Sequence, residues 1–492
     1  MTFEAALVEP VHETACDHLL NHLRSGKRQE DLCFALWHPS RGAARTTALV
    51  SELLLPEDGE RTLHGNASFE ADYVSRAVRL AAEKNAGLAL MHSHPASGWQ
   101  GMSREDVEAE RDRLSGPARA TGLPFVGLTL GTDGAWSARF WTWTGDKFER
   151  RWCQKVRVVG HRLRLTYHDR MAPPPRRRPA LRRTIDTWGA ACQADLARLR
   201  IGVVGLGSVG CIVAETLARI GIEQIVLIDA DRVEAHNLDR LLYAGEEDVG
   251  RLKVELAADQ LRRSATASAI RVDAHAGWLQ QETCFRAALD CDVLFSCVDR
   301  PLPKDVMNHI AYAHCIPVVF GGVYIDTKGD GTLGQAAWSV VHVGPEHRCL
   351  RCDGQYTTSD VVLERDGSLD DPSYIASVTG SRPRNQNVFP FSANLASLMT
   401  LEMLRMVLGA DWWPKGAGRL HYSYLPGRLN AVDERCRAHC EVRARTALGD
   451  RVAYPFLEAE PQPAGTSPAS PDPRVPARLV RWLQELMRGG KP

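Results

Sequence analysis

The chain has 492 residues, and its 60 lysines and arginines are balanced by 60 aspartates and glutamates. A formal net charge of zero gives no reason to expect nucleic acid or an anionic membrane as a partner. The sequence has no apolar run of about eighteen residues and no N-terminal segment with a basic start and an apolar centre. We therefore expect neither a membrane-spanning helix nor a signal peptide. The thirteen cysteines then indicate thiols and metal ligands in the cytoplasm rather than a disulfide framework.

Residues 1–168 have the pattern of a mixed α/β domain. Short apolar runs between polar turns predict strands, and apolar residues at helical spacing predict helices. A chain of this length has room for two or three such domains. We expect helices at 15–23 and 71–84, and strands at 32–37, 48–55, 87–91, 123–130 and 135–143.

Two histidines, His92 and His94, follow the predicted strand at 87–91. In an extended chain both side chains lie on the same face, so they can bind one metal ion together. Pro95 turns the chain, and Asp106 can supply an oxygen ligand, which leaves the fourth tetrahedral position of a catalytic Zn²⁺ open for water. The alternative is structural, because Ser103 and Asp106 also have the spacing of a capped helix start.

His-Ser-His-Pro, seven further residues, then Ser103, two residues and Asp106 together resemble the motif of the JAMM metalloproteases. This resemblance implies cleavage of the peptide or isopeptide bond after the C-terminal glycine of a ubiquitin-like protein, with Ser103 holding the tetrahedral intermediate. It also implies a glutamate base from an earlier strand. We choose Glu30, two residues before the strand at 32–37, and Glu52 in the next strand is the alternative.

Residues 169–196 are expected to form a linker and the first helix of the next domain. Prolines and arginines in 171–184 predict a stiff, extended segment, and 183–196 has helical character.

Three glycines follow the apolar run at 201–204, which reads as a buried parallel strand. Gly205 allows a tight turn, Gly207 lets the backbone approach a phosphate, and Gly210 lets a helix pack closely on the strand. A second apolar run ends in Asp229, a residue that can bind a ribose hydroxyl. This βαβ unit predicts a nucleotide with its phosphates at a helix N-terminus.

The residues beyond this unit favour a nucleoside triphosphate over NAD or FAD. Asp231, Asn237, Arg240 and Lys253 follow in order, and spread charge on a leaving pyrophosphate requires cations of this kind. Another buried strand, at 293–297, ends close to Asp299, a suitable ligand for Mg²⁺. We therefore expect ATP and Mg²⁺ as cofactors.

This series of residues, from about 183 to 440, resembles the ubiquitin-activating-enzyme superfamily, including the ThiF and MoeB adenylyltransferases. The resemblance implies adenylation of a protein's C-terminal carboxylate by ATP, in a homodimer formed through the adenylation domain. In some relatives an arginine before the core reaches the ATP of the other subunit, a role that Arg182 or Arg183 could have here.

Two pairs of cysteines follow the nucleotide core. Cys349 and Cys352 are two residues apart, whereas three residues separate Cys436 and Cys440. Two thiolate pairs suit a closed, structural Zn²⁺ site, and the alternative is a set of buried free cysteines. His439 is a less suitable ligand.

The polar segment at 353–387 contains no cysteine, although relatives that form a thioester carry their nucleophile in this region. A helix is expected at 393–408 and a last strand at 419–425. Residues 455–476 are rich in Pro, Ala and Ser and are expected to be disordered, with a short amphipathic helix at 477–487.

The sequence thus predicts an α/β protein in four parts. These are a JAMM-type metallopeptidase domain (1–168), the linker and helix (169–196), a Rossmann-like adenylation domain with structural zinc (197–450) and a tail (451–492). The metallopeptidase domain and the adenylation domain are both expected to act on the C-terminal glycine of a ubiquitin-like protein. A conjugating enzyme is a further possible partner. Bacterial fusions of this sort resemble conjugation systems associated with phage defence. The alternatives are sulfur-carrier activation in thiocarboxylate metabolism and an adenylating binding module with an inactive peptidase.

Overall fold

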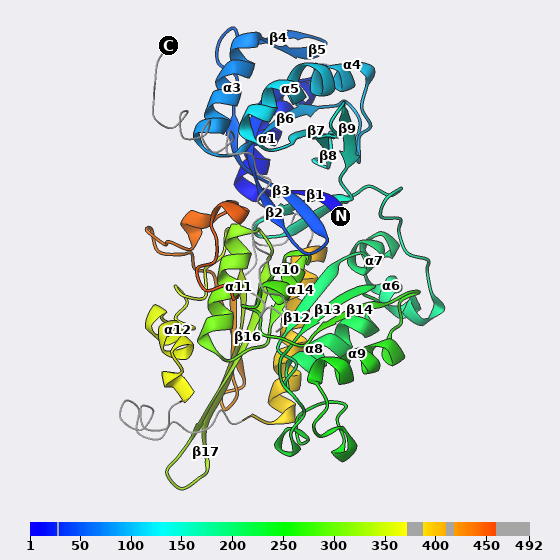
Figure 1. Cartoon of the computed structure of the whole chain (residues 1–492). Coiled ribbons are helices and arrows are strands. Elements are labelled where there is room, and N and C mark those ends of the chain that lie inside the picture. The colour runs from blue at the N-terminus through cyan, green and yellow to red at the C-terminus, as the bar shows by residue number, and fades with distance from the viewer. Residues whose placement is uncertain (27–28, 371–386, 410–417, 459–492) are drawn as a thin grey trace, which may run out of the picture. The chain divides into compact units, whose positions relative to one another are not determined.

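The computed structural model describes residues 1–26, 29–370, 387–409 and 418–458 (Figure 1). These residues build a nine-stranded sheet and an eight-stranded sheet, together with a separate hairpin of two short strands. The α/β class is confirmed, and the domain boundaries stay predictions. The predicted C-terminal disorder and the helix at 477–487 lie outside the described residues, apart from residues 455–458. Within the described part, no helix has the length and apolar character needed to cross a membrane.

The nine-stranded sheet has the order β11-β10-β1-β3-β2-β6-β7-β8-β9. Side chains of β2 alternate between two cores, because successive residues of a strand point to opposite faces. Cys33, Ala35 and Trp37 pack in one core with α1 (Glu9–Leu19), whereas Phe34 packs in the other with α3 (Ala71–Glu83). The strands are β1 (Thr2–Val8), β2 (Leu32–Arg41), β3 (Arg45–Leu54), β6 (Gly87–Ser93), β7 (Phe125–Leu130), β8 (Trp136–Trp143), β9 (Phe148–Trp152), β10 (Lys155–Val159) and β11 (Leu163–Tyr167).

Several elements of this region differ from the sequence prediction. The helix predicted at 15–23 is wrong at both ends, because α1 begins at Glu9, where Pro10 suits the first turn, and ends at Leu19 before the short α2 (Asn21–Arg24). Strand β1 was not predicted, although it pairs with β3 and β10 inside the sheet. The strands β4 (Arg61–His64), β5 (Asn66–Phe69), β9, β10 and β11 were missed as well.

The eight-stranded sheet has the order β14-β13-β12-β15-β16-β17-β18-β19, with a parallel part from β14 to β16 and antiparallel pairs beyond. Parallel strands are buried on both faces, so helices must cover both sides of this sheet, as in a Rossmann-like core. The strands are β12 (Arg200–Val204), β13 (Gln224–Ile228), β14 (Arg271–His275), β15 (Val293–Ser296), β16 (Val318–Thr327), β17 (Leu333–Val343), β18 (Arg419–Ser423) and β19 (Arg428–Val432).

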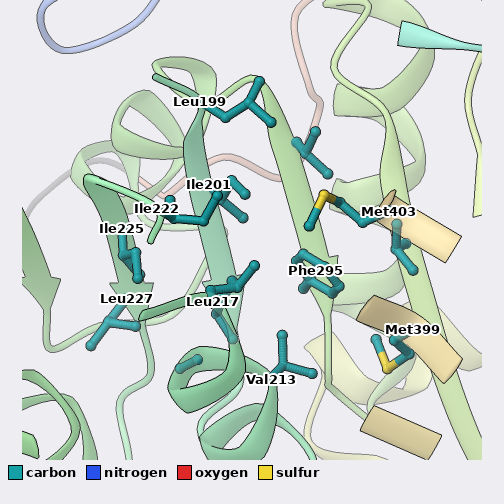
Figure 2. Packing of buried hydrophobic residues seen from close by; sticks show 14 of the residues in the cluster. Leu199, Ile201, Val213, Leu217, Ile222, Ile225, Leu227, Phe295, Met399 and Met403 are labelled. Carbon is teal, nitrogen blue, oxygen red and sulfur yellow. The ribbon is translucent and has the colours of Figure 1, made fainter. Parts of the chain in front are cut away.

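Helices cover both faces of this second sheet. One face packs on α8 (Gly210–Arg219), α9 (Lys253–Ser264) and α14 (Phe389–Leu408), and the other on α10 (Glu282–Leu289) and α11 (Pro301–Ala313). Figure 2 shows the first of these cores, where strand residues meet side chains of α8 and α14: Ile201, Ile225, Leu227, Phe295, Val213, Leu217, Met399 and Met403.

Three predictions for this region need correction. The helix predicted at 183–196 is two helices, α6 (Arg182–Trp188) and α7 (Ala190–Ala197), broken at Gly189 with its positive φ of 89°. The strand predicted to be last, at 419–425, is β18, and β19 follows it. The polar segment after Cys352 contains α12 (Thr358–Arg365), which begins with a capping box at Thr357.

A buried group of charges connects the two sheets. Arg45 of β3 donates to the carboxylates of Glu4 at 3.0 Å and Asp292 at 2.9 Å, and Lys155 of β10 donates to Asp292 at 2.5 Å. Each of these charged side chains is less than a tenth exposed. Removing one partner would leave an uncompensated buried charge, so these contacts help to hold the two sheets together in one compact unit, residues 1–458.

Candidate functional site

The loop between β12 and α8 is shaped by its glycines. Gly205 has φ +85°, and a Cβ there would lie 2.7 Å from the carbonyl oxygen of Cys297. A Cβ on Gly210 would lie 1.8 Å from the carbonyl oxygen of Gly205, so only glycine lets α8 approach the strand this closely. Gly207 faces open space. The turn, the close packing and the accessible backbone are therefore all present.

Asp229, directly after β13, holds this loop in place. Its carboxylate accepts hydrogen bonds from the backbone N–H groups of Leu206 at 2.5 Å and Asp231 at 2.7 Å. Burial raises the pKa of this carboxyl, and the two N–H donors and Lys253 act in the opposite direction. Its contact with a ribose stays a prediction; each carboxylate oxygen has one backbone donor and keeps a second lone pair that a ribose hydroxyl could use.

The cationic residues gather around the same loop. The ammonium of Lys253, at the first position of α9, lies 2.8 Å from the carboxylate of Asp231. Arg240 donates to the carbonyl of His236 at 2.6 Å and to Asp239 at 2.8 Å. Asn237 accepts from the backbone N–H of Glu234 at 3.2 Å, which stabilises the turn that carries Arg240.

One cavity of about 990 Å³ brings the predicted nucleotide residues together. It is large enough for a nucleotide and part of a second substrate, since ligand pockets of about 300–1,000 Å³ are usual. Gly210 lies outside the lining, as its packing role requires. The predicted residues that line the cavity are Gly205, Gly207, Asp229, Asp231, Asn237, Arg240, Lys253 and Asp299.

Sequence reasoning missed the opposite wall of this cavity. Arg419 and His421 of β18 both contact the hydroxyl of Ser339 on β17, at 3.3 Å and 2.8 Å. Asn387 donates to the hydroxyl of Ser208 at 3.0 Å, next to the glycine loop. These residues are brought to the cavity by strand pairing and chain reversal, so no local motif identifies them.

The predicted metal ligands of the N-terminal region also meet. His92 Nε2 and His94 Nε2 are 3.2 Å apart, and the carboxylate of Asp106 lies 3.4 Å from the first and 3.3 Å from the second. Ligands about 2.05 Å from a tetrahedral Zn²⁺ are about 3.3 Å apart, so the three residues fit this ion. Burial alone would raise the pKa of Asp106, but the hydrogen bonds with the two histidines outweigh it and hold that pKa below its usual range.

Glu30 and Glu52 have different surroundings. Burial raises the pKa of Glu30, and the charges of His94, His92 and Asp106 also act on its carboxyl. Glu52 pairs instead with Lys84 at 2.6 Å on the surface. Glu30, and not Glu52, therefore lies close enough to the His92, His94 and Asp106 group for their charges to act on its carboxyl.

Ser103 caps the helix α4 (Arg104–Val107). Its hydroxyl accepts from the N–H of Asp106 at 3.0 Å, and the Asp106 carboxylate accepts from the N–H of Ser103 at 2.7 Å. The capping box anticipated as the structural alternative is therefore present. It coexists with the cluster, because the same carboxylate contacts both histidines.

The four cysteines form a second cluster, whose sulfur atoms lie within 4.8 Å of one another. The Sγ atoms of Cys349 and Cys440 are 3.7 Å apart, the edge length of a tetrahedron with Zn–S bonds of about 2.3 Å. Backbone N–H groups donate to the sulfurs of Cys436 and Cys349, which stabilises thiolates. The hydrogen bond between the two thiols lowers the pKa of Cys436 below its usual value and raises that of Cys349, so Cys436 is the first to become a thiolate. The residues fit a structural Zn²⁺, and His439 is exposed outside the cluster.

The fold and the large cavity define a nucleotide-binding protein of the Rossmann-like α/β class. Residues 181–442 match the model of the ThiF family, so the chain belongs to this family. The resemblance drawn from the glycine loop and the residues after it is thereby confirmed for the adenylation domain. The matched region begins after the nine-stranded sheet.

Individual relatives are similar over the same part of the chain. An adenylyltransferase and sulfurtransferase MOCS3 of Caenorhabditis briggsae is 28% identical over 168 residues, which are 34% of this chain and 39% of that protein. A sulfur carrier protein adenylyltransferase of Thermus thermophilus is 30% identical over 164 residues, or 33% of this chain and 59% of the relative. The alignments thus span only part of each relative's length.

Among solved structures, E. coli MccB with ATP is similar at a TM-score of 0.43 and 18% identity. The similarity covers 54% of this chain and 74% of MccB.

Proposed function

We propose that the chain uses ATP to adenylate the C-terminal carboxylate of a small ubiquitin-like or sulfur-carrier protein. The observation that carries this proposal is the single cavity that joins the glycine loop with Arg240, Lys253 and Asp299. Family membership supports it independently, because the relatives similar to this chain are named adenylyltransferases.

The residues around the cavity suit attack by a carboxylate on the α-phosphorus of ATP. A carboxylate oxygen forms the new bond to phosphorus, the bond to the β-phosphate oxygen breaks, and pyrophosphate leaves. The backbone at Gly207 and the cations Lys253 and Arg240 can balance the charge that develops on the leaving group. Asp299 and Asp231 would hold Mg²⁺, which supplies further charge neutralisation when bound.

Two classes of protein substrate fit this reaction, and the names of the relatives favour a sulfur carrier. A ubiquitin-like modifier handed to a conjugating enzyme is the second class. We further propose that the adenylation domain acts as a homodimer. The test is ATP–pyrophosphate exchange with purified proteins of both classes, each compared with a variant that lacks its terminal glycine. Exchange that depends on neither class would contradict the proposal.

A second activity is proposed for the N-terminal domain: zinc-dependent cleavage of the bond after the same terminal glycine. It rests on the agreement between the His92, His94 and Asp106 distances and a tetrahedral zinc site. A bound Zn²⁺ would act as a Lewis acid there, and Glu30 would accept and return a proton. The cleavage of a precursor that extends beyond its terminal glycine tests this activity, with His94→Ala as the inactive control.

A further inference from the structure

The proposed base Glu30 lies just beyond the end of a strand ladder. The antiparallel pairing of β2 with β6 ends where Leu32 stands opposite His92. Continued by two residues, the same register puts Glu30 opposite His94. Side chains of directly opposite residues share one face of a sheet, so the register directs Glu30 toward the metal ligands. The charges of His94 and His92 act on the Glu30 carboxyl, in agreement with this register.

The turn of a separate hairpin contacts the backbone of Glu30. This hairpin consists of β4 and β5, and its turn lies at Gly65. The N–H of Glu30 donates to the carbonyl of Gly65 at 3.0 Å. The Gln29 side chain accepts from the N–H of Gly65 at 2.9 Å and donates to the carbonyl of Asn66 at 3.0 Å. Its amide also donates to the carbonyl of Glu30 at 2.7 Å, so one side chain binds the turn and the base together.

Asp31, the residue after the base, is bonded to the elements on both sides. Its carbonyl accepts from the N–H of Ser93 on β6 at 3.0 Å. Its carboxylate is buried and pairs with the guanidinium of Arg61 on β4. Residues 29–31 are thus bonded one after another to the β4–β5 hairpin, and the segment keeps its contact with the strand that carries His92.

We propose that Gln29 positions the carboxylate of Glu30 for proton transfer, by binding the backbone of Glu30 to the turn of the β4–β5 hairpin. The inference rests on the proposed peptidase activity and adds a residue that holds its base in place. Gln29 is a positioning residue, because its contacts are with the backbone of the base and with the hairpin.

This support is needed because the large sheet does not hold the base on that side. Among the described residues, the ladder of β2 with β3 ends at the pair of Phe34 with Leu54. A base must lie within hydrogen-bond distance of the proton that it accepts, and a displacement of about 1 Å can lower turnover about 100-fold. The Gln29 side chain is partly exposed, so its removal should leave the fold intact.

Gln29→Leu, Glu30→Gln and the double variant, all in the full chain, form a double-mutant cycle that separates positioning from a general effect on the fold. Leucine keeps most of the volume of glutamine and removes all three hydrogen bonds. Zinc content is measured for each protein, and kcat and KM are determined for a ubiquitin-like precursor extended beyond its terminal glycine. Thr62→Val is the matched control, because the Thr62 hydroxyl anchors β4 elsewhere, by a bond of 3.0 Å to Glu70.

Gln29→Leu is expected to keep its zinc and its KM and to lower kcat about 10- to 100-fold, while Thr62→Val cleaves normally. In the Glu30→Gln background the same substitution should change kcat less than about 2-fold, because no base is left to be displaced. An unchanged kcat in Gln29→Leu, or a full additional loss in the double variant, would overturn the positioning role while leaving the peptidase intact. If the unmodified chain cleaves no faster than Glu30→Gln, the assigned base fails and the positioning role fails with it.

Discussion

The Lys253 ammonium lies 2.8 Å from the Asp231 carboxylate, and the backbone N–H of Lys253 donates to the Asp231 carbonyl at 3.0 Å. These two bonds connect the start of α9 to the chain just after β13, at the wall of the nucleotide cavity. The ammonium is thereby held beside the glycine loop without a nucleotide. A site prepared in this way needs little reorganisation when charge develops on a phosphate.

Lys253→Ala and Asp299→Ala are therefore expected to lower ATP–pyrophosphate exchange by about 10²- to 10³-fold each. The reason is that one removes a cation that balances phosphate charge and the other removes a ligand for Mg²⁺. Lys147→Ala, on the exposed turn before β9, is the matched control and should exchange normally. Peptidase turnover should be unchanged in all three variants, and normal exchange in either cavity variant would contradict the assigned role.

The nucleotide residues could be predicted because they follow a single strand–loop–helix unit and the loops directly after it. Arg419, His421 and Ser339 could not, because they reach the cavity through the pairing of β17 with β18. Arg419 is 214 residues after Gly205 in the sequence, and pairing partners at such separations leave no local pattern. Arg139 of β8 was not predicted as a buried partner of Glu110, for a similar reason. It lies in a strand rich in aromatic residues, and its sequence context does not show that it faces Glu110.

Glu30→Gln is expected to keep the metal and lose peptidase turnover by at least about 10²-fold, since it removes a proton acceptor without removing a ligand. Zinc content and cleavage of the extended precursor are measured on the same preparation. Glu52→Gln is the matched control because its carboxylate pairs with Lys84. Lost turnover in Glu52→Gln together with normal turnover in Glu30→Gln would reverse the assignment.

The chain is expected to bind two zinc ions, and the two sites should differ in their effect on stability. Cys436→Ser should remove one ion and destabilise the fold by more than about 3 kcal/mol, because its cluster connects two segments that are far apart in the sequence, 349–352 and 436–440. His92→Ala should remove the other ion with a smaller change in melting temperature. Metal analysis and thermal unfolding check both, and an unchanged zinc content in Cys436→Ser would exclude the cysteine site.

His309 of α11 predicts a pH dependence of stability. Burial, with a smaller contribution from Arg445, lowers its pKa to about 4, and among the described residues neither ring nitrogen has a hydrogen-bond partner. Below about pH 6.5 the unfolded chain binds a proton that the folded chain does not, so stability falls as the pH drops toward 4. This histidine then contributes a loss on the order of 3 kcal/mol.

His309→Leu should reduce the slope of unfolding free energy against pH between pH 6.5 and 4. The slope should not vanish, because His314 beside it also has a lowered pKa and contributes in the same direction. Urea unfolding at several pH values gives the measurement. An identical slope in the variant and the unmodified chain would show that His309 is already protonated in the fold.

Three strands of the parallel core, β12, β13 and β15, were predicted because a strand buried on both faces is a continuous apolar run, whereas β14 and β16 were missed. Strand β1 was missed because its apolar run, Ala5 to Val8, is short and follows directly after Glu4, and its position in the sheet depends on pairing with β3 and β10. A charged residue such as Glu4 normally argues against a strand in the core. Here Glu4 is buried because it forms an ion pair with Arg45. Local propensity cannot show such compensation.

The last prediction concerns the fate of the acyl-adenylate. Storage as a thioester requires a thiolate near the activated carbonyl. Among the described residues lining the cavity, Cys297 is the one cysteine, and burial raises its pKa well above the ordinary value. Burial also raises the pKa of Cys211 to about 11 and of Cys315 to about 12, so both stay protonated at neutral pH. The sequence contains no cysteine between Cys352 and Cys436.

We therefore expect the chain to form an acyl-adenylate but no stable thioester with itself, so that the activated carboxylate passes directly to a partner's nucleophile. The enzyme, ATP, Mg²⁺ and the protein substrate identified by exchange are incubated and separated on non-reducing gels. Exchange activity without a thiol-sensitive adduct is the expected outcome, because a protonated thiol attacks too slowly to compete with release. An adduct that disappears in Cys297→Ala would show instead that this cysteine becomes deprotonated when the nucleotide binds. Its loss in another single cysteine variant would place the nucleophile outside the cavity wall.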